Sequence, residues 1–548
     1  MQGFALSPKK VPITLVIGLG ACLILALLTR LPGLEFGVPD LWHPDEQRLI
    51  YNPAKRFAAG EGLGLPRWPY PPLMAELVGI VLRVFPYDPP TLRAIAVGRG
   101  ISAGLGIVGV LATALAAWTA TRRVGPTLVA GGLVAFAPIA IQLGHYATPD
   151  GAALGCVGLA LWASARALDG PDEREASRPW ALLGIGAATG LAAAFKYNAA
   201  MIAVLAIAAT ASRIAARLSS DADASIQARL RVAAIECGWL LAAGLVAIGV
   251  FVASLVPVWS ELGDLERGLR QEWEHYRHTG HIGFTTESAA ADALVNLWGA
   301  GIGGPALLVS LAIPLLRERS RALAASALLM SLAYLLLLAP QQVFFDRVVF
   351  VLIPPLALVA GLAGDALVER GAAWASERWP AHQRRLSIGL PSLAVAALLV
   401  VPAWRGGLMV RALTTPDTRA QSRDYLLGVT DAESKVLHMP RDLYLAPTIS
   451  GRENIRLDPR MGPRRSLARR PDYVVFVDGY WERFSNNPIG SANLRKRERA
   501  WRKALDRRYD IAEVFEGPSL PCRGCPGTTI SAYHHPKVTV YVRRSSSK

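Results

Sequence analysis

The stretch His43-Pro44-Asp45-Glu46 places two adjacent carboxylates, a proline and a histidine directly after the first long apolar run. A carboxylate can remove a proton from an attacking hydroxyl or amine, so Asp45 and Glu46 are candidate catalytic residues. Proline and acidic side chains are also favoured in the first turn of a helix. The four residues therefore fit an active site and a helix start equally well.

Three further positions carry charges beside apolar segments. Asp150 is the acidic residue of the loop 144–150, where it fits an N-cap or a second catalytic carboxylate. Lys196 has no acidic neighbour in the sequence, so it either snorkels to the membrane interface or binds a phosphate. Arg347 follows Asp346 and fits a surface ion pair or a second phosphate contact.

Carboxylates and isolated cations together suit a lipid phosphate substrate. A cation stabilises a phosphate as it leaves, while a carboxylate takes the proton of the attacking group. A sugar carried on a polyprenyl phosphate requires both functions. We find no G-x-G-x-x-G motif after a strand and no P-loop, so a nucleotide site is not expected.

The elements that must position these residues are membrane helices. Of 548 residues, 52% are hydrophobic and 18% charged, which is too apolar for a soluble protein of this length. Runs of about 20 apolar residues are typical of transmembrane helices. We expect an α-helical polytopic membrane protein with about eleven such helices, near residues 11–29, 97–119, 126–143, 151–168, 180–195, 199–216, 233–256, 291–316, 322–339, 348–367 and 388–404.

The basic residues of the short loops predict the orientation. Lys9-Lys10 and Arg122-Arg123 fall on one side, together with the basic loops 166–178, 213–231, 317–321 and 370–385. The opposite short loops, 144–150 and 340–347, carry only Arg347. The positive-inside rule then places the N-terminus in the cytoplasm. Eleven crossings place three longer segments outside it, namely 30–92, 257–290 and 405–548.

Residues 405–548 are expected to form a separate extracytoplasmic α/β domain, and residues 1–404 the membrane domain with the outer loops 30–92 and 257–290. The pattern predicts a basic helix at 491–508 and strands at 436–439, 473–477, 511–515 and 538–542. Within loop 30–92, it predicts a short helix from Glu46 to Ala59.

The tail is basic and carries a lone CxxC pair. From Arg411 onward, 26 Lys and Arg and 15 Asp and Glu account for 11 of the net charge of +16. Contact with anionic membrane lipids fits a polytopic protein better than nucleic acid does, so no nucleic-acid partner is expected. Cys522 and Cys525 cannot complete a tetrahedral zinc site, and a local disulfide is the better interpretation.

The order of these motifs resembles the GT-C membrane glycosyltransferases, most of all the protein O-mannosyltransferase and lipid A aminoarabinose transferase group. The resemblance covers roughly residues 10–367. It rests on Pro44-Asp-Glu-Gln-Arg48, Tyr70-Pro-Pro-Leu73, Arg99-Gly-Ile-Ser, Thr148-Pro-Asp150, Lys196-Tyr197 and Arg347. It implies a polyprenyl- or dolichyl-phosphate sugar donor and an inverting transfer.

The resemblance also implies roles for individual residues. Asp45 matches the loop-one aspartate that acts as the base, and Glu46 and Arg48 match neighbours that position acceptor and donor. Asp150 matches the second-loop aspartate, and Lys196 matches a lysine that contacts the donor phosphate. The other substrate-binding candidates are Tyr70, Arg99, Tyr197 and Arg347.

Some members of the group bind a divalent metal beside the site. Here the candidate ligands are Glu76 and either His275 or His278. Three histidines, at 275, 278 and 281, lie within seven residues of the loop 257–290, although a solvated loop explains them equally well. No other cofactor is expected.

We therefore expect a membrane glycosyltransferase that moves a sugar to an extracytoplasmic glycan, lipid or protein, with Asp45 as base. No β-trefoil repeat is visible, unlike in eukaryotic protein mannosyltransferases, which makes a protein acceptor the weaker case. The main alternative is a transporter or lipid flippase without covalent chemistry. Such proteins often have internal repeats and charges at mid-membrane, whereas here no repeat is seen and the acidic residues gather at one surface.

Overall fold

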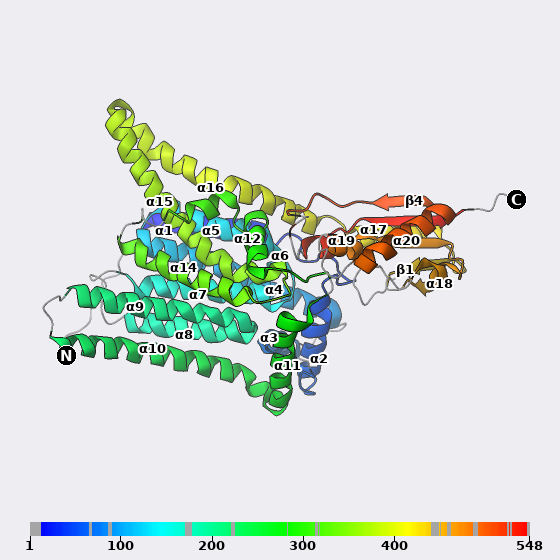
Figure 1. Ribbon diagram of the computed structural model, residues 1–548, viewed down its shortest axis with the longest axis horizontal. Helices are drawn as coiled ribbons and strands as arrows, with labels where there is room; N and C mark the ends of the chain where they lie inside the picture. The colour runs from blue at the N-terminus through cyan, green and yellow to red at the C-terminus, as the bar shows by residue number, and fades with distance from the viewer. Residues whose placement is uncertain are drawn as a thin grey trace.

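The computed structural model describes residues 12–544 except for short gaps, at 65–67, 86–89, 170–177, 221–224, 282, 313–315, 317, 440–448, 450, 458–461, 486–491, 523–524 and 526–528. Lys9-Lys10 and most of the predicted basic loop 166–178 therefore lie outside the described residues. Long helices run side by side along the length of the molecule, and a β-sheet with its own helices lies at one end (Figure 1). The candidate site described below lies at the same end as the sheet.

Helices account for nearly all of the first 414 residues that are described. In chain order they are α1 (Ile13–Arg30), η1 (Glu46–Tyr51), α2 (Asn52–Ala58), α3 (Leu73–Val84), α4 (Pro90–Thr121), α5 (Val124–Phe136), α6 (Pro138–His145), α7 (Pro149–Ala167), α8 (Arg178–Phe195), η3 (Tyr197–Ile202), α9 (Ala203–Ser220), α10 (Ile226–Leu255), η4 (Val256–Glu261), α11 (Leu262–Glu274), η5 (His275–Thr279), α12 (Ala289–Gly299), α13 (Gly304–Val309), α14 (Glu318–Leu338), η7 (Asp346–Leu352), α15 (Ile353–Arg378), η8 (Pro380–His382) and α16 (Gln383–Thr414). Each of the eleven predicted apolar segments contains helix.

The chain is a helical multi-pass membrane protein. Among the described residues, seven helices are long and apolar enough to cross a membrane, or eight if the bent pair α5 and α6 forms one span. The predicted count of eleven would also need α7, α8 and the pair α12 and α13 to cross. Gly and Ala dilute the apolar character of α7, and Gly301 to Gly303 separate α12 from α13. The count of eleven therefore stays a prediction.

Small residues bring α4 and α7 into close contact. A Cβ atom added at Gly155 would lie 2.5 Å from the carbonyl oxygen of Leu105, and one at Gly158 would lie 2.7 Å from that of Gly109. Small residues allow membrane helices to approach this closely and pack well. The contact fixes the ends of both helices, from which Arg99 and Asp150 project.

The predicted outer loops are more helical than the sequence indicated. The predicted helix from Glu46 to Ala59 is present as η1 followed by α2, but α3 was not anticipated. The segment 257–290 contains α11, which crosses the end of α10 at a steep angle (Figure 1). These short helices line the end of the bundle that faces the sheet.

The C-terminal region contains a five-stranded mixed sheet in the order β2-β1-β3-β5-β4. β1 pairs in parallel with β2 and β3, whereas β5 pairs antiparallel with β3 and β4. The strands are β1 (Lys435–His438), β2 (Glu453–Arg456), β3 (Tyr473–Val477), β4 (Tyr509–Phe515) and β5 (Val538–Arg543). All four predicted strands are present, and β2 is the one that was missed because its sequence, Glu-Asn-Ile-Arg, is mostly polar.

Five helices accompany the sheet: α17 (Thr418–Val429), α18 (Pro463–Leu467), α19 (Asp478–Ser485), α20 (Ala492–Arg508) and α21 (Ile530–Tyr533). The predicted domain boundary at residue 404 falls inside α16, and the two-domain division stays a prediction. α20 matches the predicted basic helix.

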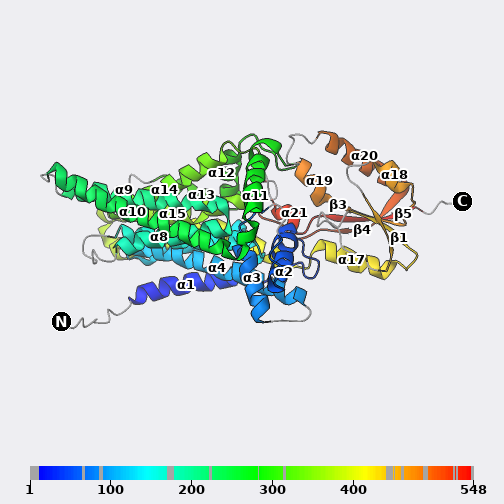
Figure 2. The same cartoon turned by 90° about the horizontal axis from the view of Figure 1, so that it is seen from below.

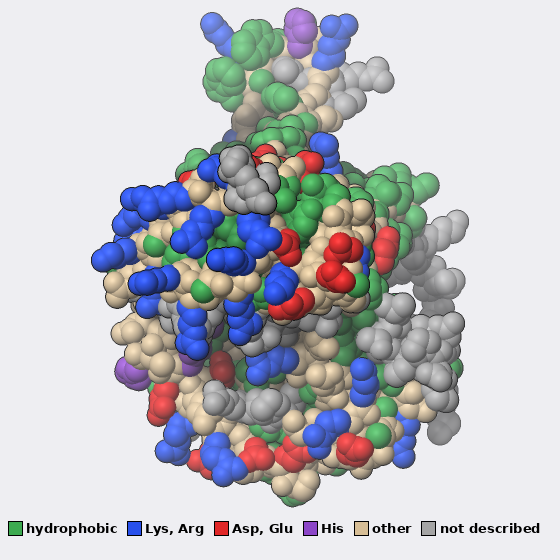
Figure 3. Space-filling view, turned by 90° about the vertical axis from the view of Figure 1, so that its right-hand side faces the viewer, with side chains coloured by type: hydrophobic (Ala, Val, Ile, Leu, Met, Phe, Trp, Pro, Cys, Tyr) green, Lys and Arg blue, Asp and Glu red, His purple; other side chains and the backbone are tan. Residues whose placement is uncertain are grey.

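The far end of the C-terminal region is rich in Lys and Arg (Figure 3). Exposed cations of α18 and α20 include Arg464, Lys496, Arg497, Lys503 and Arg507. This end lies away from the long helices (Figure 1). The basic tail was expected to contact anionic membrane lipids, and this position differs from a tail lying against the membrane that the long helices cross.

Candidate active site

Asp45 lies at the start of the π-helical turn η1, a type of turn that is frequent at functional sites. Its backbone N–H donates to Nδ1 of His43 over 3.2 Å, which gives His43 the hydrogen-bonding role left open by the sequence. Burial lowers the pKa of His43, so its ring is neutral and Nδ1 is free to accept. His43 thereby orients the backbone that carries Asp45.

The carboxylate of Asp45 has two side-chain donors on one oxygen. The hydroxyl of Tyr70 donates to Oδ2 over 2.7 Å, and Nη1 of Arg347 forms an ion pair with the same atom. Burial raises the pKa of Asp45, but the charge of Arg347 and these hydrogen bonds outweigh burial and hold the pKa below its usual range. Asp45 is therefore ionised at neutral pH.

Glu46, the neighbouring carboxylate, is in a different situation. Arg99 of α4 binds it with two hydrogen bonds of 2.8 Å, and the backbone N–H of Ala147 donates a third over 2.8 Å. Nη1 of Arg99 donates to the carbonyl oxygens of Leu34 and Phe36. Both charged side chains are at most 1% exposed. Glu46 and Arg99 therefore join loop one to α4 and to the second loop.

Asp150 and Lys196 form a second buried ion pair close to Asp45. Asp150 lies in the first turn of α7, and Lys196 lies between α8 and η3, where the chain is extended. The ammonium group of Lys196 is 5.3 Å from the ring centroid of Tyr70, and the guanidinium carbon of Arg347 is 5.8 Å from it. Two cations from separate parts of the chain thus flank the tyrosine that contacts Asp45.

Several buried polar atoms around these pairs have no hydrogen-bond partner within the described part of the chain. They are Oδ2 of Asp150, Nε of Arg347, the hydroxyl of Tyr197 and Oδ1 of Asn198. An unsatisfied buried polar group costs about 1–3 kcal/mol, so such groups are rarely left without a role. These atoms can contact a bound ligand without breaking an existing hydrogen bond.

The remaining predicted residues lie differently. Arg48 is exposed on η1. Glu76 is buried in α3, where burial raises its pKa to about 8, so its carboxyl is neutral at pH 7. His275 packs edge-on against His281, and His278 is exposed.

The predicted metal ligands do not form a metal site in this arrangement. Within the described ranges, no group of three or more His, Cys, Asp and Glu side chains is placed to hold a metal ion.

The structure adds residues to which the sequence assigned no role in the site. Glu272 of α11 interacts electrostatically with Arg347, Asp45 and Lys196. From the C-terminal region, His534 contacts Tyr146 over 2.9 Å, and Thr529 contacts Asp346, the neighbour of Arg347, over 2.7 Å. Only the acidic and histidine-rich composition of loop 257–290 drew attention to Glu272, and no local pattern pointed to Thr529.

One segment of the chain, which carries several of the candidate site residues, matches a known protein family. Residues 92–224 match the family model described as dolichyl-phosphate-mannose-protein mannosyltransferase. This segment includes Arg99, Asp150, Lys196 and Tyr197 but not Asp45 or Arg347. No curated protein matches the chain significantly in sequence.

Several solved structures are similar to this chain at low identity. ArnT from Cupriavidus metallidurans in the apo state is 13% identical, with 97% of this chain and 98% of that chain covered and a TM-score of 0.48. The archaeal oligosaccharyltransferase AglB from Archaeoglobus fulgidus is 13% identical, with 90% and 72% covered and a TM-score of 0.49. The Pmt1-Pmt2 protein O-mannosyltransferase complex of S. cerevisiae is 16% identical, with 52% and 37% covered and a TM-score of 0.36.

The assignment rests on the sequence match and not on these structural scores. The resemblance stated from the motifs is thereby confirmed. Over residues 92–224 the chain is similar to the dolichyl-phosphate-mannose-protein mannosyltransferase family, and this match supports a membrane glycosyltransferase that uses a sugar donor carried on a polyprenyl phosphate.

Proposed function

We propose that this protein transfers a sugar from a polyprenyl phosphate to an extracytoplasmic acceptor, with inversion at the sugar carbon and with Asp45 as the base. The observation that carries the proposal is the meeting of Lys196 and Arg347 over one ring, that of Tyr70, whose hydroxyl binds Asp45. Paired cations beside a carboxylate are what a phosphate leaving group and an attacking nucleophile require.

The orientation inferred from the loops is part of the proposal. The site lies at the end of the bundle that carries the sheet, and Arg123, just after the end of α4, pairs with Asp365 and Glu369 of α15. We place the N-terminus in the cytoplasm and the site with residues 405–548 outside it. Eleven crossings, including α7, α8 and the pair α12 and α13, satisfy this arrangement.

The donor phosphate would bind between Lys196 and Arg347. Nε of Arg347 has no partner among the described residues, and the lysine ammonium lies beside it over the same ring. Arg347 and Lys196 would neutralise the charge that develops on the phosphate as it departs. Oδ1 of Asn198 and the hydroxyl of Tyr197 have no partner among the described residues and would bind hydroxyls of the sugar.

The transfer itself moves one proton and breaks one bond. The acceptor oxygen or nitrogen attacks the sugar carbon from the face opposite the phosphate, and its proton passes to Asp45. The bond from that carbon to the phosphate oxygen breaks, and its electron pair leaves with the polyprenyl phosphate. Tyr70 keeps its own proton, because burial raises its pKa well above 10, and so it can orient Asp45 throughout.

Donor binding would also activate the base. While Arg347 pairs with Asp45, the carboxylate has a low proton affinity and is a weak base. A phosphate that competes for Arg347 weakens that pair and returns the pKa of Asp45 towards its ordinary value. The base would therefore gain strength only when the donor is in place.

Asp45→Asn tests the proposal, because it keeps the shape of the side chain and removes the base. We expect transfer from a polyprenyl-phosphate sugar to fall about 10²- to 10⁴-fold, the range that general base catalysis supplies. The variant should still insert in the membrane and bind polyprenyl phosphate. The measurement is release of polyprenyl phosphate by the purified full-length chain, with membranes of a cell lacking the protein as the source of acceptor.

Two results would contradict the proposal. Undiminished transfer by Asp45→Asn would remove Asp45 from the chemistry. Movement of an intact lipid-linked sugar across a vesicle bilayer without release of polyprenyl phosphate would instead favour the flippase alternative.

A further inference from the structure

The last part of the chain enters the helical region beside the proposed site. α21 (Ile530–Tyr533) lies between the long helices and the sheet (Figure 2). Ile530 is fully buried in the same hydrophobic core as the membrane helices, and Leu520 and Cys522 pack against that core. Of residues 520–535, those that the structure describes (520–522, 525 and 529–535) are here called the C-terminal insert, and they belong to the packing of the membrane helices.

Thr529 of the insert holds Asp346 with two hydrogen bonds. Its backbone N–H donates to Oδ2 and its hydroxyl to Oδ1, each over 2.7 Å. Nε2 of Gln142 donates to the same hydroxyl over 3.1 Å. Asp346 and Thr529 are 1% exposed, so no solvent can replace these bonds. The next residue after Asp346 is Arg347, the proposed phosphate contact.

His534 of the insert makes a second contact near the site, with Tyr146. Its Nδ1 contacts the carbonyl oxygen of Ile530 and therefore carries the proton, which leaves Nε2 to accept from the hydroxyl of Tyr146 over 2.9 Å. Burial lowers the pKa of His534 to about 3, which keeps the ring neutral. The ring of His43 lies 4.7 Å from Tyr146 and 4.7 Å from Tyr533.

These contacts form a continuous path to the base. His43, held between the two tyrosines, accepts the backbone N–H of Asp45. The insert therefore supports the proposed base through His43 and the proposed phosphate contact through Asp346.

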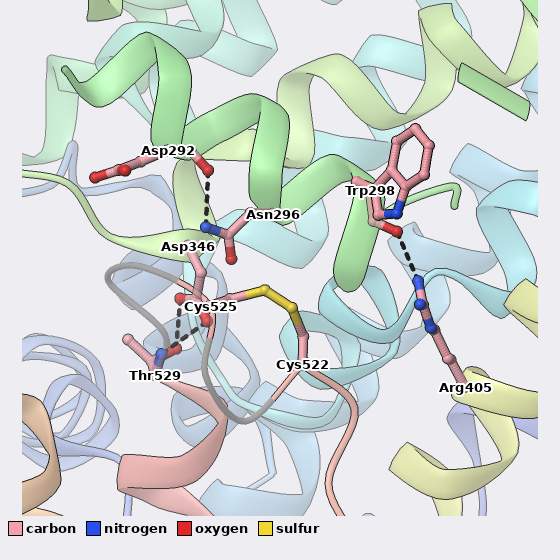
Figure 4. The surroundings of a disulfide bond; sticks show 8 residues. All are labelled: Asp292, Asn296, Trp298, Asp346, Arg405, Cys522, Cys525 and Thr529. Atoms are coloured by element: carbon pink, nitrogen blue, oxygen red, sulfur yellow. Dashed lines mark hydrogen bonds between the residues drawn. A yellow bond between two sulfur atoms is a disulfide. The ribbon is translucent and has the colours of Figure 1, made fainter. Parts of the chain in front are cut away.

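A disulfide fixes the start of the insert. Cys522 and Cys525 are joined beside α12, close to Asp346 and Thr529 (Figure 4). A Cβ atom added at Gly299, the last residue of α12, would come within 2.0 Å of Sγ of Cys522. The glycine thus permits the disulfide loop to lie directly on the helix end.

We propose that the C-terminal insert positions the active site, with Thr529 and His534 as positioning residues for Arg347 and Asp45 respectively. This inference rests on the proposed function and adds a division of labour to it. Thr529 governs the affinity for the donor phosphate, and His534 governs the rate of the chemical step.

Substitutions at the two residues should split the kinetic constants. Thr529→Val removes the hydroxyl bonds to Asp346 and Gln142, and we expect the KM for the donor and the Kd for polyprenyl phosphate to rise about tenfold with a smaller change in kcat. His534→Leu removes the acceptor of the Tyr146 hydroxyl, and we expect kcat to fall about 10- to 100-fold, as small displacements of reacting groups do. Thr529→Ser and His534→Gln retain the hydrogen-bonding groups and should recover most of each loss.

Matched variants control for general destabilisation. Thr113→Val makes the same change at a buried position of α4, where the hydroxyl bonds only its own helix through Gly109, and should leave both constants unchanged. Gly299→Ala should push the disulfide loop away and raise the donor KM, whereas Gly244→Ala, at a helix position with open space, should not.

The outcomes separate this inference from the proposed function. If the wild-type protein transfers sugar and both positioning variants match it, the inference is wrong while the function stands. If Thr529→Val, His534→Leu and their conservative partners all change KM and kcat by equal factors, the insert has a purely structural role. If the wild-type protein does not transfer sugar, the function fails, and the Kd of Thr529→Val for polyprenyl phosphate alone then decides whether the insert positions Arg347.

Discussion

Two adjacent carboxylates in loop one occupy opposite kinds of environment. Glu46 receives three hydrogen bonds and shares a bidentate pair with Arg99, and four of the five arginine N–H groups have acceptors. Asp45 and its partner Arg347 are slightly more exposed, at 16% and 12% of their side chains, and Nε of Arg347 lacks a partner among the described residues.

The difference shows how to tell a structural ion pair from a functional one. A buried pair that satisfies nearly all its hydrogen bonds has little left to offer a ligand, and breaking it leaves an uncompensated charge. A pair with unused donors and partial exposure can exchange partners when a substrate arrives. By this criterion we assign Glu46 and Arg99 a supporting role, and propose that Asp45, Asp150, Lys196 and Arg347 form the site.

The largest effect on the fold should come from breaking the complete pair. Arg99→Leu leaves Glu46 buried without its cation, and we expect the free energy of unfolding to fall by about 3–5 kcal/mol. Denaturant unfolding of the purified protein in detergent measures the change, and Asp45→Asn is the comparison. A variant that is as stable as the wild type but inactive would place Arg99 among the substrate contacts. The distinction between a structural and a functional ion pair would then be wrong.

A smaller effect, measured on binding, is expected at the incomplete pair of Asp150 and Lys196. Lys196→Met preserves the length of the side chain and removes the charge. Hydrogen bonds to charged groups contribute about 1.5–3 kcal/mol, so the affinity for polyprenyl phosphate should fall about 10- to 100-fold. Titration with polyprenyl phosphate in detergent provides the Kd, and an unchanged Kd would remove Lys196 from the phosphate site.

The smallest effect on transfer at neutral pH is expected for Glu76→Gln, because the Glu76 carboxyl is already neutral there. Burial raises the pKa of Glu76 from 4.5 to about 8. The contribution of this carboxyl to the free energy of unfolding is therefore fully present below pH 4.5 and is lost as the pH rises through 8. The variant should therefore gain stability relative to the wild type between these values. Unfolding measured across pH 4 to 9 checks the sign, and a parallel pair of curves would contradict it.

Local sequence patterns identified the elements but could not assign the partners. The strand Tyr473–Val477 was predicted to the residue because its apolar β-branched run is self-evident. The candidate site residues Asp45, Asp150, Lys196 and Arg347 were singled out because isolated charges beside apolar helices are rare and costly. The mutual pairing of Glu46 and Arg99, 53 residues apart, depends on how α4 packs against loop one, and no periodicity records that.

The two halves of the site's support also differ in how visible they are. His43 is close to Asp45 in the sequence and was noticed for that reason, but its role as acceptor of the Asp45 N–H was not predicted. Thr529 and His534 lie in a basic tail whose composition suggested surface exposure, yet both are buried against membrane helices. Their burial results from tertiary contacts across hundreds of residues, which a single sequence does not encode in any local signal.

The bond between Tyr146 and His534 spans 388 residues of sequence. Because chains are synthesised from the N-terminus and fold largely in that order, the loop-one residues reach the membrane long before the C-terminal insert exists. A nascent chain that already has most of its helices would still lack the groups that set the geometry of Asp45 and Arg347. Catalytic competence would then coincide with completion of the polypeptide, so that unfinished chains in the bilayer would not consume lipid-linked sugar.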